Sequence, residues 1–297
     1  MKADAAETLS LGSNGPYRGR CAVLATMHGK EATIAPPFAE RLGLSVEIPP
    51  GLDTDSLGTF SGEIARTGTI EEAAIAKARL GMAVTGVTLA IASEGSYGPH
   101  PQIPFIAAGF ELMVLVDDDR GIVIREHLID ESPTYEHANA ESVRELDGFL
   151  SRIGFPDHAV IVRPNGPDGS APPIHKGIRS SADLQTAIED CATRSDDGRA
   201  FVQTDMRAHM NRTRMATLGR LAERLAARIS CLCPTCRTPG YGLTGVDKGL
   251  PCSWCGGPSI LVRHQILGCV SCNHVERRAR PDGLTHADPG QCPTCNP

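Results

Sequence analysis

Four Cys-x-x-Cys pairs near the carboxyl terminus constrain the fold of this 297-residue chain more than any other feature. Fifteen residues separate the first two pairs and nineteen separate the last two; the pairs are Cys233/Cys236, Cys252/Cys255, Cys269/Cys272 and Cys292/Cys295. This is the spacing of zinc ribbons, in which each pair places two thiolates on one tight turn. Two such turns complete a tetrahedral shell, so the sequence predicts two zinc ions, each bound by four cysteines.

Four protein sulfurs leave no open position on the metal, so both zinc sites are expected to be structural. They also account for the folding of a segment with few large apolar residues. The simplest pairing joins the first pair with the second and the third with the fourth, and an interleaved pairing stays open. Redox pairs or a disulfide framework are the alternatives, but four repeats at ribbon spacing favour metal.

Charge and hydropathy exclude several classes of protein. The net charge of −6 argues against a nucleic-acid footprint spread over the whole surface. No apolar run approaches the length of a membrane span, so no membrane partner is expected. The first residues lack the basic start and apolar core of a secretory signal, which indicates a flexible tail over residues 1–17 and a cytoplasmic protein.

Short apolar runs alternate with helical patterns between residues 18 and 230, ahead of a double zinc-ribbon module at residues 231–297. This alternation predicts an α/β domain with a mixed, largely parallel sheet and flanking helices. The ribbon module holds six basic and four acidic residues, a net charge of +2. Zinc ribbons often bind nucleic acid, and a basic run at residues 277–280 makes DNA or RNA a possible partner of this module.

The stretch from Thr69 to Pro101 carries the densest set of candidate site residues. It predicts a helix capped at Thr67 or Thr69, a buried strand at residues 87–92, and a glycine-rich loop at residues 93–101. Ligands usually bind at the carboxyl ends of strands in α/β sheets, so this loop is a candidate site that includes Glu94.

Two further segments have the composition of anion-binding sites. The strand at residues 21–26 leads into a turn with Thr26, His28 and Lys30, whose N–H groups and ammonium can hold an anion. Arginines at the start of a late helix, among them Arg212 and Arg214, suit phosphate or carboxylate. A polar loop also carries Asp53, Asp55 and Glu63, which we interpret as turn and cap residues rather than as a metal site.

The blocks ATMHGKE, DTDSLGTFSGEI and ASEGSYGPHP, together with the cysteine pairs, resemble a bacterial family of unknown function. The α/β half is also distantly similar to the inosine-triphosphate pyrophosphatase and Maf-like superfamily. The turn from Thr26 to Lys30 is similar to its phosphate-binding T-x-N-x-x-K turn, one residue shorter. Residues 69–78 follow the register of its T-[FI]-x-E-N-A-x-x-K-A helix, with Ala73 in place of Asn. Residues 93–95 are similar to its acidic loop, and residues 211–214 to its basic phosphate-binding pair.

The resemblance implies a Mg²⁺-dependent phosphohydrolase that acts on a nucleotide or a related phosphate ester, similar to a nucleoside triphosphate pyrophosphatase. Glu72 and Glu94 would hold the metal, and Glu94 would act as the base. The residues implied in phosphate binding are Thr26, His28, Lys30, Lys77, Arg212 and Arg214. The competing hypothesis is a non-catalytic protein whose zinc ribbons bind nucleic acid or a protein partner.

Overall fold

The computed structural model describes residues 15–27, 29–54, 68–100, 103–166 and 172–297. The chain divides into two compact units, one spanning Tyr17–Ala226 and the other including Ala227–Pro297. The division falls inside the long helix α5 (Arg212–Ser230). The predicted boundary between residues 230 and 231 stays a prediction.

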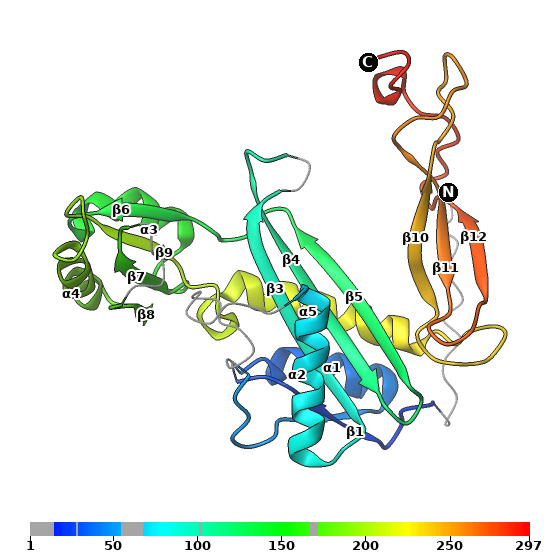
Figure 1. Cartoon of the computed structure of the whole chain (residues 1–297), viewed down its shortest axis with the longest axis horizontal. Helices are drawn as coiled ribbons and strands as arrows, with labels where there is room; N and C mark the ends of the chain where they lie inside the picture. The colour runs from blue at the N-terminus through cyan, green and yellow to red at the C-terminus, as the bar shows by residue number, and fades with distance from the viewer. Residues whose placement is uncertain (1–14, 28, 55–67, 101–102, 167–171) are drawn as a thin grey trace. The chain divides into compact units, whose positions relative to one another are not determined.

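The first sheet of the Tyr17–Ala226 unit has the strand order β2-β1-β3-β4-β5. Its strands β2, β1 and β3 run parallel, and β3, β4 and β5 form an antiparallel meander (Figure 1). The bounds are β1 Cys21–Leu24, β2 Ser45–Glu47, β3 Leu89–Pro99, β4 Ala107–Asp117 and β5 Ile122–Asp130. Helices α1 (Glu31–Leu42) and α2 (Ile70–Thr85) provide the crossovers between the parallel strands.

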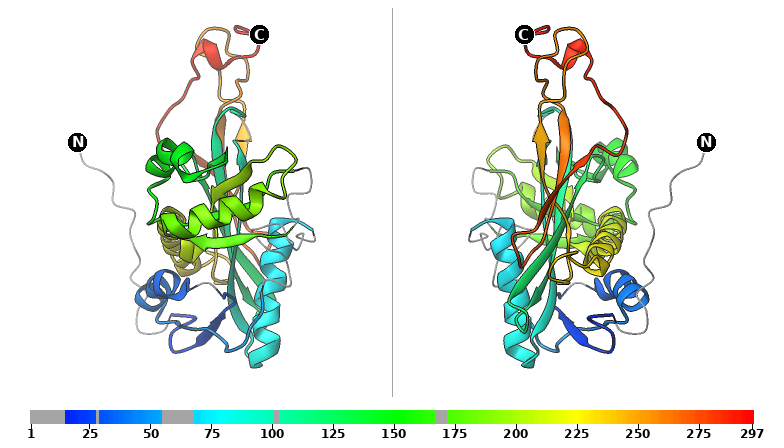
Figure 2. Two further views of the ribbon diagram at one scale, coloured as in Figure 1. Left: turned by 90° about the vertical axis from the view of Figure 1, so that its left-hand side faces the viewer. Right: turned by 90° about the vertical axis from the view of Figure 1, so that its right-hand side faces the viewer.

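Helices cover both faces of this sheet. Alanines at 74 and 78 of α2 pack on Ala90 of β3 and on Leu112 and Val114 of β4. Helices α1 and α5 lie on the opposite face, as Figure 2 shows. Gly219 permits their close approach, because a Cβ atom at 219 would lie 3.0 Å from the Thr33 methyl group of α1.

Helix α2 begins at a capping box. The Thr69 hydroxyl accepts a hydrogen bond from the Glu72 N–H at 3.2 Å, and the Glu72 carboxylate accepts one from the Thr69 N–H at 2.7 Å. Both groups would otherwise lack partners at the helix N-terminus. The predicted cap at Thr69 is therefore confirmed.

A second sheet in the same unit has the order β6-β9-β7-β8 and is antiparallel throughout. Its strands are β6 His137–Ala140, β7 Val160–Pro164, β8 His175–Ile178 and β9 Ala200–Thr204. Helices α3 (Asp147–Ile153) and α4 (Ser181–Ala192) pack on it, and their buried residues form a separate apolar core with the sheet.

The cysteine-rich unit is built on the antiparallel sheet β10-β11-β12, with bounds Gly242–Lys248, Val262–Gly268 and Val275–Ala279. Each strand runs from one cysteine pair to the vicinity of the next. Few large apolar side chains are buried among the described residues of this unit: they are Ile229, Tyr241 and Leu250, beside three of the cysteines, Cys233, Cys252 and Cys292.

The α/β class of the fold is confirmed, with a smaller share of parallel pairing than the sequence indicates. The strands β3, β4 and β5 follow one another in the chain and pair antiparallel. The predicted loop at residues 93–101 is wrong for residues 93–99, because the extended β4 pairs with them and continues β3 as far as Pro99. Among the described residues, no helix is both long and apolar enough to span a membrane.

Candidate functional site

In the described part of the chain, the eight predicted cysteines come together in two groups of four. The first group is Cys233, Cys236, Cys269 and Cys272, and the second is Cys252, Cys255, Cys292 and Cys295. Within each group the sulfur atoms lie within 4.8 Å of one another. The closest cross-pair Sγ–Sγ distances range from 3.5 Å to 3.9 Å. A tetrahedral ion with metal–sulfur bonds of about 2.3 Å requires sulfurs about 3.8 Å apart, so both groups can hold zinc.

The pairing is interleaved, which is the alternative that the sequence leaves open, and the simpler sequential pairing is wrong. The strand β10 leads away from the Cys233 turn, and the antiparallel β11 returns toward it and ends just before Cys269. The next strand, β12, again runs to the far end, where Cys292 meets Cys252. Alternating strand direction therefore joins the first pair with the third and the second with the fourth.

The turns of the first two cysteine pairs share one backbone geometry. Residue 237 follows the first pair and residue 256 follows the second, and both have positive φ, 63° at Arg237 and 69° at Gly256. The N–H groups of these two residues donate to the carbonyls of Cys233 and Cys252. Backbone N–H groups also point at the sulfurs, as from Trp254 to Cys252 at 3.4 Å and from Ser271 to Cys269 at 3.3 Å. Such donors stabilise thiolates, the form that binds metal.

The surface of the cysteine-rich unit is only weakly basic. Two of the three arginines at residues 277–280 are engaged locally, Arg278 with Glu276 and Arg280 with Asp282. Trp254, between the two cysteines of the second pair, is 79% exposed. This side chain can stack on a base or pack against an apolar partner.

A second candidate site lies in the Tyr17–Ala226 unit, around β3. On the α2 face of the sheet, Lys77 of α2 forms a buried ion pair with Glu94 of β3. On the opposite face, the Lys30 ammonium donates a hydrogen bond to the Ser93 hydroxyl at 3.0 Å. Neighbouring residues of a strand point to opposite faces, which separates Ser93 from Glu94.

Arg214 completes the charged group on the Lys30 side of the sheet. Its Nε donates to Glu111 Oε1 at 2.6 Å, and its Nη2 to Oε2 at 3.3 Å. The Tyr97 hydroxyl donates to the same carboxylate at 2.6 Å. Glu111 and Tyr97 did not stand out in the sequence, although a lone Glu inside the apolar strand at residues 110–116 is a signal for a buried ionic partner.

Lys30 is the cation that these contacts leave without a carboxylate. Lys77 and Arg214 each form an ion pair, whereas among the described residues Lys30 forms none and has only its bond to Ser93. Burial, followed by the positive charge of Arg214, lowers the pKa of Lys30 to about 8. Glu111 and Glu94 lie close enough to oppose that effect. An anion beside Lys30 would offset its positive charge.

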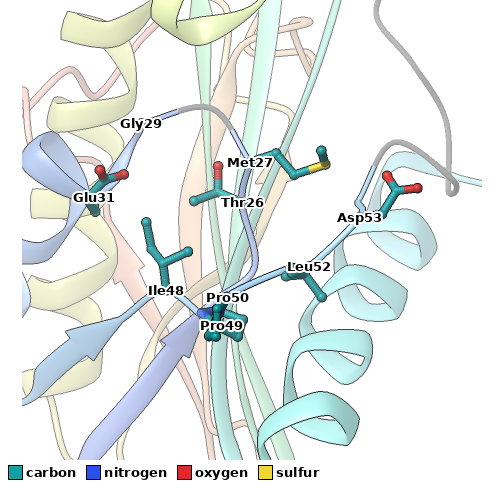
Figure 3. Close-up of a pocket in the computed structure, with 10 residues that line it drawn as sticks. Thr26, Met27, Gly29, Glu31, Ile48, Pro49, Pro50, Leu52 and Asp53 are labelled. Carbon is teal, nitrogen blue, oxygen red and sulfur yellow. The ribbon is translucent and has the colours of Figure 1, made fainter.

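A cavity of about 520 Å³ opens at the carboxyl ends of β1 and β2. The loop between β1 and α1, which also carries Lys30, contributes Thr26, Met27 and Gly29 to its lining, and the first residue of α1 contributes Glu31. The segment after β2 contributes residues 48–53 (Figure 3). Thr26 is the predicted phosphate-binding residue that lines this cavity in the described part of the chain.

Two of the predicted site residues, Glu72 and Arg212, lie away from this group, and a third lies outside the described residues. Glu72 is exposed, and its contacts in the capping box with Thr69 lower the pKa of its carboxyl group. Arg212 is exposed and pairs with Asp157 at 2.7 Å. His28, like Asp55 and Glu63, lies outside the described residues. The structure therefore groups Lys30, Lys77, Glu94 and Arg214 around β3 and does not bring Glu72 or Arg212 into contact with them.

Together these features define a protein with a mixed α/β unit and a cysteine-rich unit that can hold two metal ions. The chain belongs to a family described as a domain of unknown function (DUF6671), whose match covers residues 77–297. This range includes the cysteine groups, Glu94 and Arg214. No curated protein and no solved structure matches the chain. The resemblance to the inosine-triphosphate pyrophosphatase superfamily stays a hypothesis.

Proposed function

We propose that the Tyr17–Ala226 unit binds the phosphate group of a nucleotide or a related ester beside Lys30. The observation that supports this proposal is a buried ammonium without a carboxylate partner among the described residues, next to two ion pairs. A neutral lysine that only bonds to Ser93 is the simpler alternative. The residues on either side of Lys30, Gly29 and Glu31, line the adjoining cavity, which an isolated core lysine would not need.

We further propose that the bound ester is hydrolysed with Mg²⁺ as cofactor. Mg²⁺ is commonly held by one or two carboxylates together with substrate phosphates. Glu94 is the carboxylate that we assign to this role: it pairs with Lys77 on the α2 face of the sheet, and its charge still acts on Lys30. The metal would supply charge neutralisation at the phosphate. Lys30 would bind a phosphate oxygen, while Arg214 is largely committed to Glu111 and would position Tyr97 and the strand around it.

The test is a panel of nucleoside mono-, di- and triphosphates with Mg²⁺ or Mn²⁺, assayed for release of phosphate or pyrophosphate. Glu94→Gln is expected to abolish release, and Lys30→Met to weaken nucleotide binding. Glu47→Gln on the exposed part of β2 is the matched control for both. Nucleotide binding without hydrolysis would leave the binding proposal intact and remove the catalytic one. No binding to any member of the panel would remove both.

For the cysteine-rich unit we propose two structural zinc ions, one in each group of four thiolates. Support comes from the sulfur spacing and from the closed shells, which leave no ligand position for a substrate. All the cysteines in the described residues are free of disulfides, which fits a reducing cytoplasm.

The second candidate function is a non-catalytic one, in which the ribbons bind nucleic acid or a protein. The exposure of Trp254 favours it. If nucleic acid is the partner, Trp254→Ala should weaken binding at all salt concentrations, and Arg277→Ala should reduce the salt dependence. The absence of salt-dependent binding to DNA and RNA would leave a protein partner.

A further inference from the structure

The cavity beside the β1–α1 loop has one apolar wall. Ile48, Pro49, Pro50 and Leu52, all in the segment after β2, line it, and Met27 belongs to the β1–α1 loop (Figure 3). Ile48 and Met27 are 37% and 47% exposed, so both present apolar surface to a ligand in the cavity. The Thr54 N–H bonds to the Met27 sulfur at 3.1 Å and ties the two segments together. A wall of this kind suits a flat apolar ring.

The polar groups of the cavity are mainly hydrogen-bond acceptors. Glu31 and Asp53 contribute carboxylates, and Thr26 contributes a hydroxyl. Glu31 Oε2 is buried and has no hydrogen-bond partner among the described residues. A buried acceptor left unpaired is costly, so a ligand that donates a hydrogen bond there gains affinity.

We propose that this cavity binds a purine base of the guanine type, with the ring on the apolar wall and its N–H edge toward Glu31. Guanine carries two neighbouring donors, N1–H and the 2-amino group, which match the two oxygens of one carboxylate. The inference rests on the proposed function in one respect: Lys30, the next residue to Glu31, would bind the phosphate of the same ligand. It names the class of substrate, a guanine nucleotide.

Other ligand classes fit the lining less well. Adenine offers one amino donor on its corresponding edge, next to a ring nitrogen that a carboxylate repels. A ligand with its own carboxylate would meet Glu31 and Asp53 and be repelled. A sugar or polyol can donate hydrogen bonds, but it has no flat apolar face for Ile48 and the prolines.

The experiment is calorimetric titration of the full chain with GMP, IMP, AMP, guanosine and pyrophosphate. GMP is expected to bind about ten- to a hundredfold more tightly than AMP, the range for hydrogen bonds to a charged group. IMP, which keeps N1–H and lacks the 2-amino group, should fall between them. Glu31→Gln should remove the preference for GMP, because the amide replaces one acceptor with a donor. Glu40→Gln, at an exposed position of the same helix, should keep it.

A second variant covers the case in which Glu31→Gln does not fold. The Ile48 side chain is 37% exposed, so Ile48→Ser changes a residue outside the core. This variant should bind GMP and AMP more weakly to the same extent and should bind pyrophosphate as the wild type does. Equal affinities for GMP and AMP, or a Glu31→Gln protein that retains the preference, would overturn the guanine assignment.

The probes separate this inference from the proposed function. Lys30-dependent binding of pyrophosphate without any preference among bases would retain phosphate binding and overturn the base site. Glu31-dependent binding of guanosine without binding of pyrophosphate would retain the base site and overturn the phosphate site. Failure of all five probes would overturn both.

Discussion

Arg214 and Glu111 form an ion pair that is almost completely withdrawn from water, with Nε 2.6 Å from Oε1. The two residues lie 103 positions apart in the chain, one on α5 and the other on β4. Their pairing fixes α5 on the sheet. It also fixes the position of the β3 segment that carries Glu94.

Glu111→Gln should destabilise the protein by about 3–5 kcal/mol, because it leaves the buried guanidinium without a counter-charge. The double variant Glu111→Met/Arg214→Met should recover much of this loss, since it removes both charges. Denaturant unfolding of the single and double variants measures the two effects. Arg152→Met breaks the exposed pair with Glu136 and should cost at most about 1 kcal/mol. A Glu111→Gln cost in that same small range would contradict the assignment of Arg214 as a buried charge.

Gly95 is the position on β3 where a side chain cannot be accommodated. It pairs across the strands with Glu111, and a Cβ atom there would lie 2.7 Å from both carboxylate oxygens and from Arg214 Nη2. Gly95→Ala should therefore cost about 1–3 kcal/mol, as overpacking in a core does. Gly98→Ala on the same strand has no atom within 4 Å of the added methyl group and should be nearly neutral. Thermal unfolding of both variants makes the comparison, and equal midpoints would show that the charged pair yields to the methyl group.

The local pattern of the sequence predicts elements better than it predicts partners. The cap at Thr69 was predictable because Glu72 stands three residues later, and the cysteine ligands because their spacing reflects one turn. Glu111 was not singled out, although Arg214 was, because an ion pair between distant segments leaves no periodic signal. The division into two sheets was missed for the same reason, since periodicity gives strands but not their neighbours. The zinc pairing depends on the direction of β10 and β11, which no cysteine spacing encodes.

Lys30 gives the proposed phosphate site a pH dependence. Its pKa is lowered to about 8 by burial, so the ammonium in the unliganded protein loses its proton as the pH rises through that value. Affinity for pyrophosphate should thus be highest below about pH 8 and fall between pH 8 and 9.5. Lys30→Arg keeps its charge over this range and should flatten the profile.

The lowered pKa of Lys30 should make the folded protein more stable as the pH rises, whereas it makes anion binding weaker. A base with a lowered pKa in the folded state binds fewer protons than in the unfolded state between about pH 8 and its ordinary value near 10.5. The free energy of unfolding should therefore rise over that window in the wild type, and this rise should be absent in Lys30→Met.

For the binding experiment, a pyrophosphate affinity that is constant from pH 7 to 9.5 would mean that Lys30 does not contact the anion.

The interleaved pairing of the cysteines makes a prediction that the sequential pairing reverses. Cys233→Ser/Cys269→Ser removes two ligands from one group, so about one zinc per chain should remain. Cys233→Ser/Cys252→Ser removes one ligand from each group and should weaken both sites. Native mass spectrometry with metal analysis distinguishes the two variants, with about two zinc ions expected in the wild type. Removal of the metal with a chelator should unfold the cysteine-rich unit, because few apolar side chains are buried there to replace it. Retention of one zinc by the Cys233→Ser/Cys252→Ser protein, together with loss of both by the other variant, would restore the sequential arrangement.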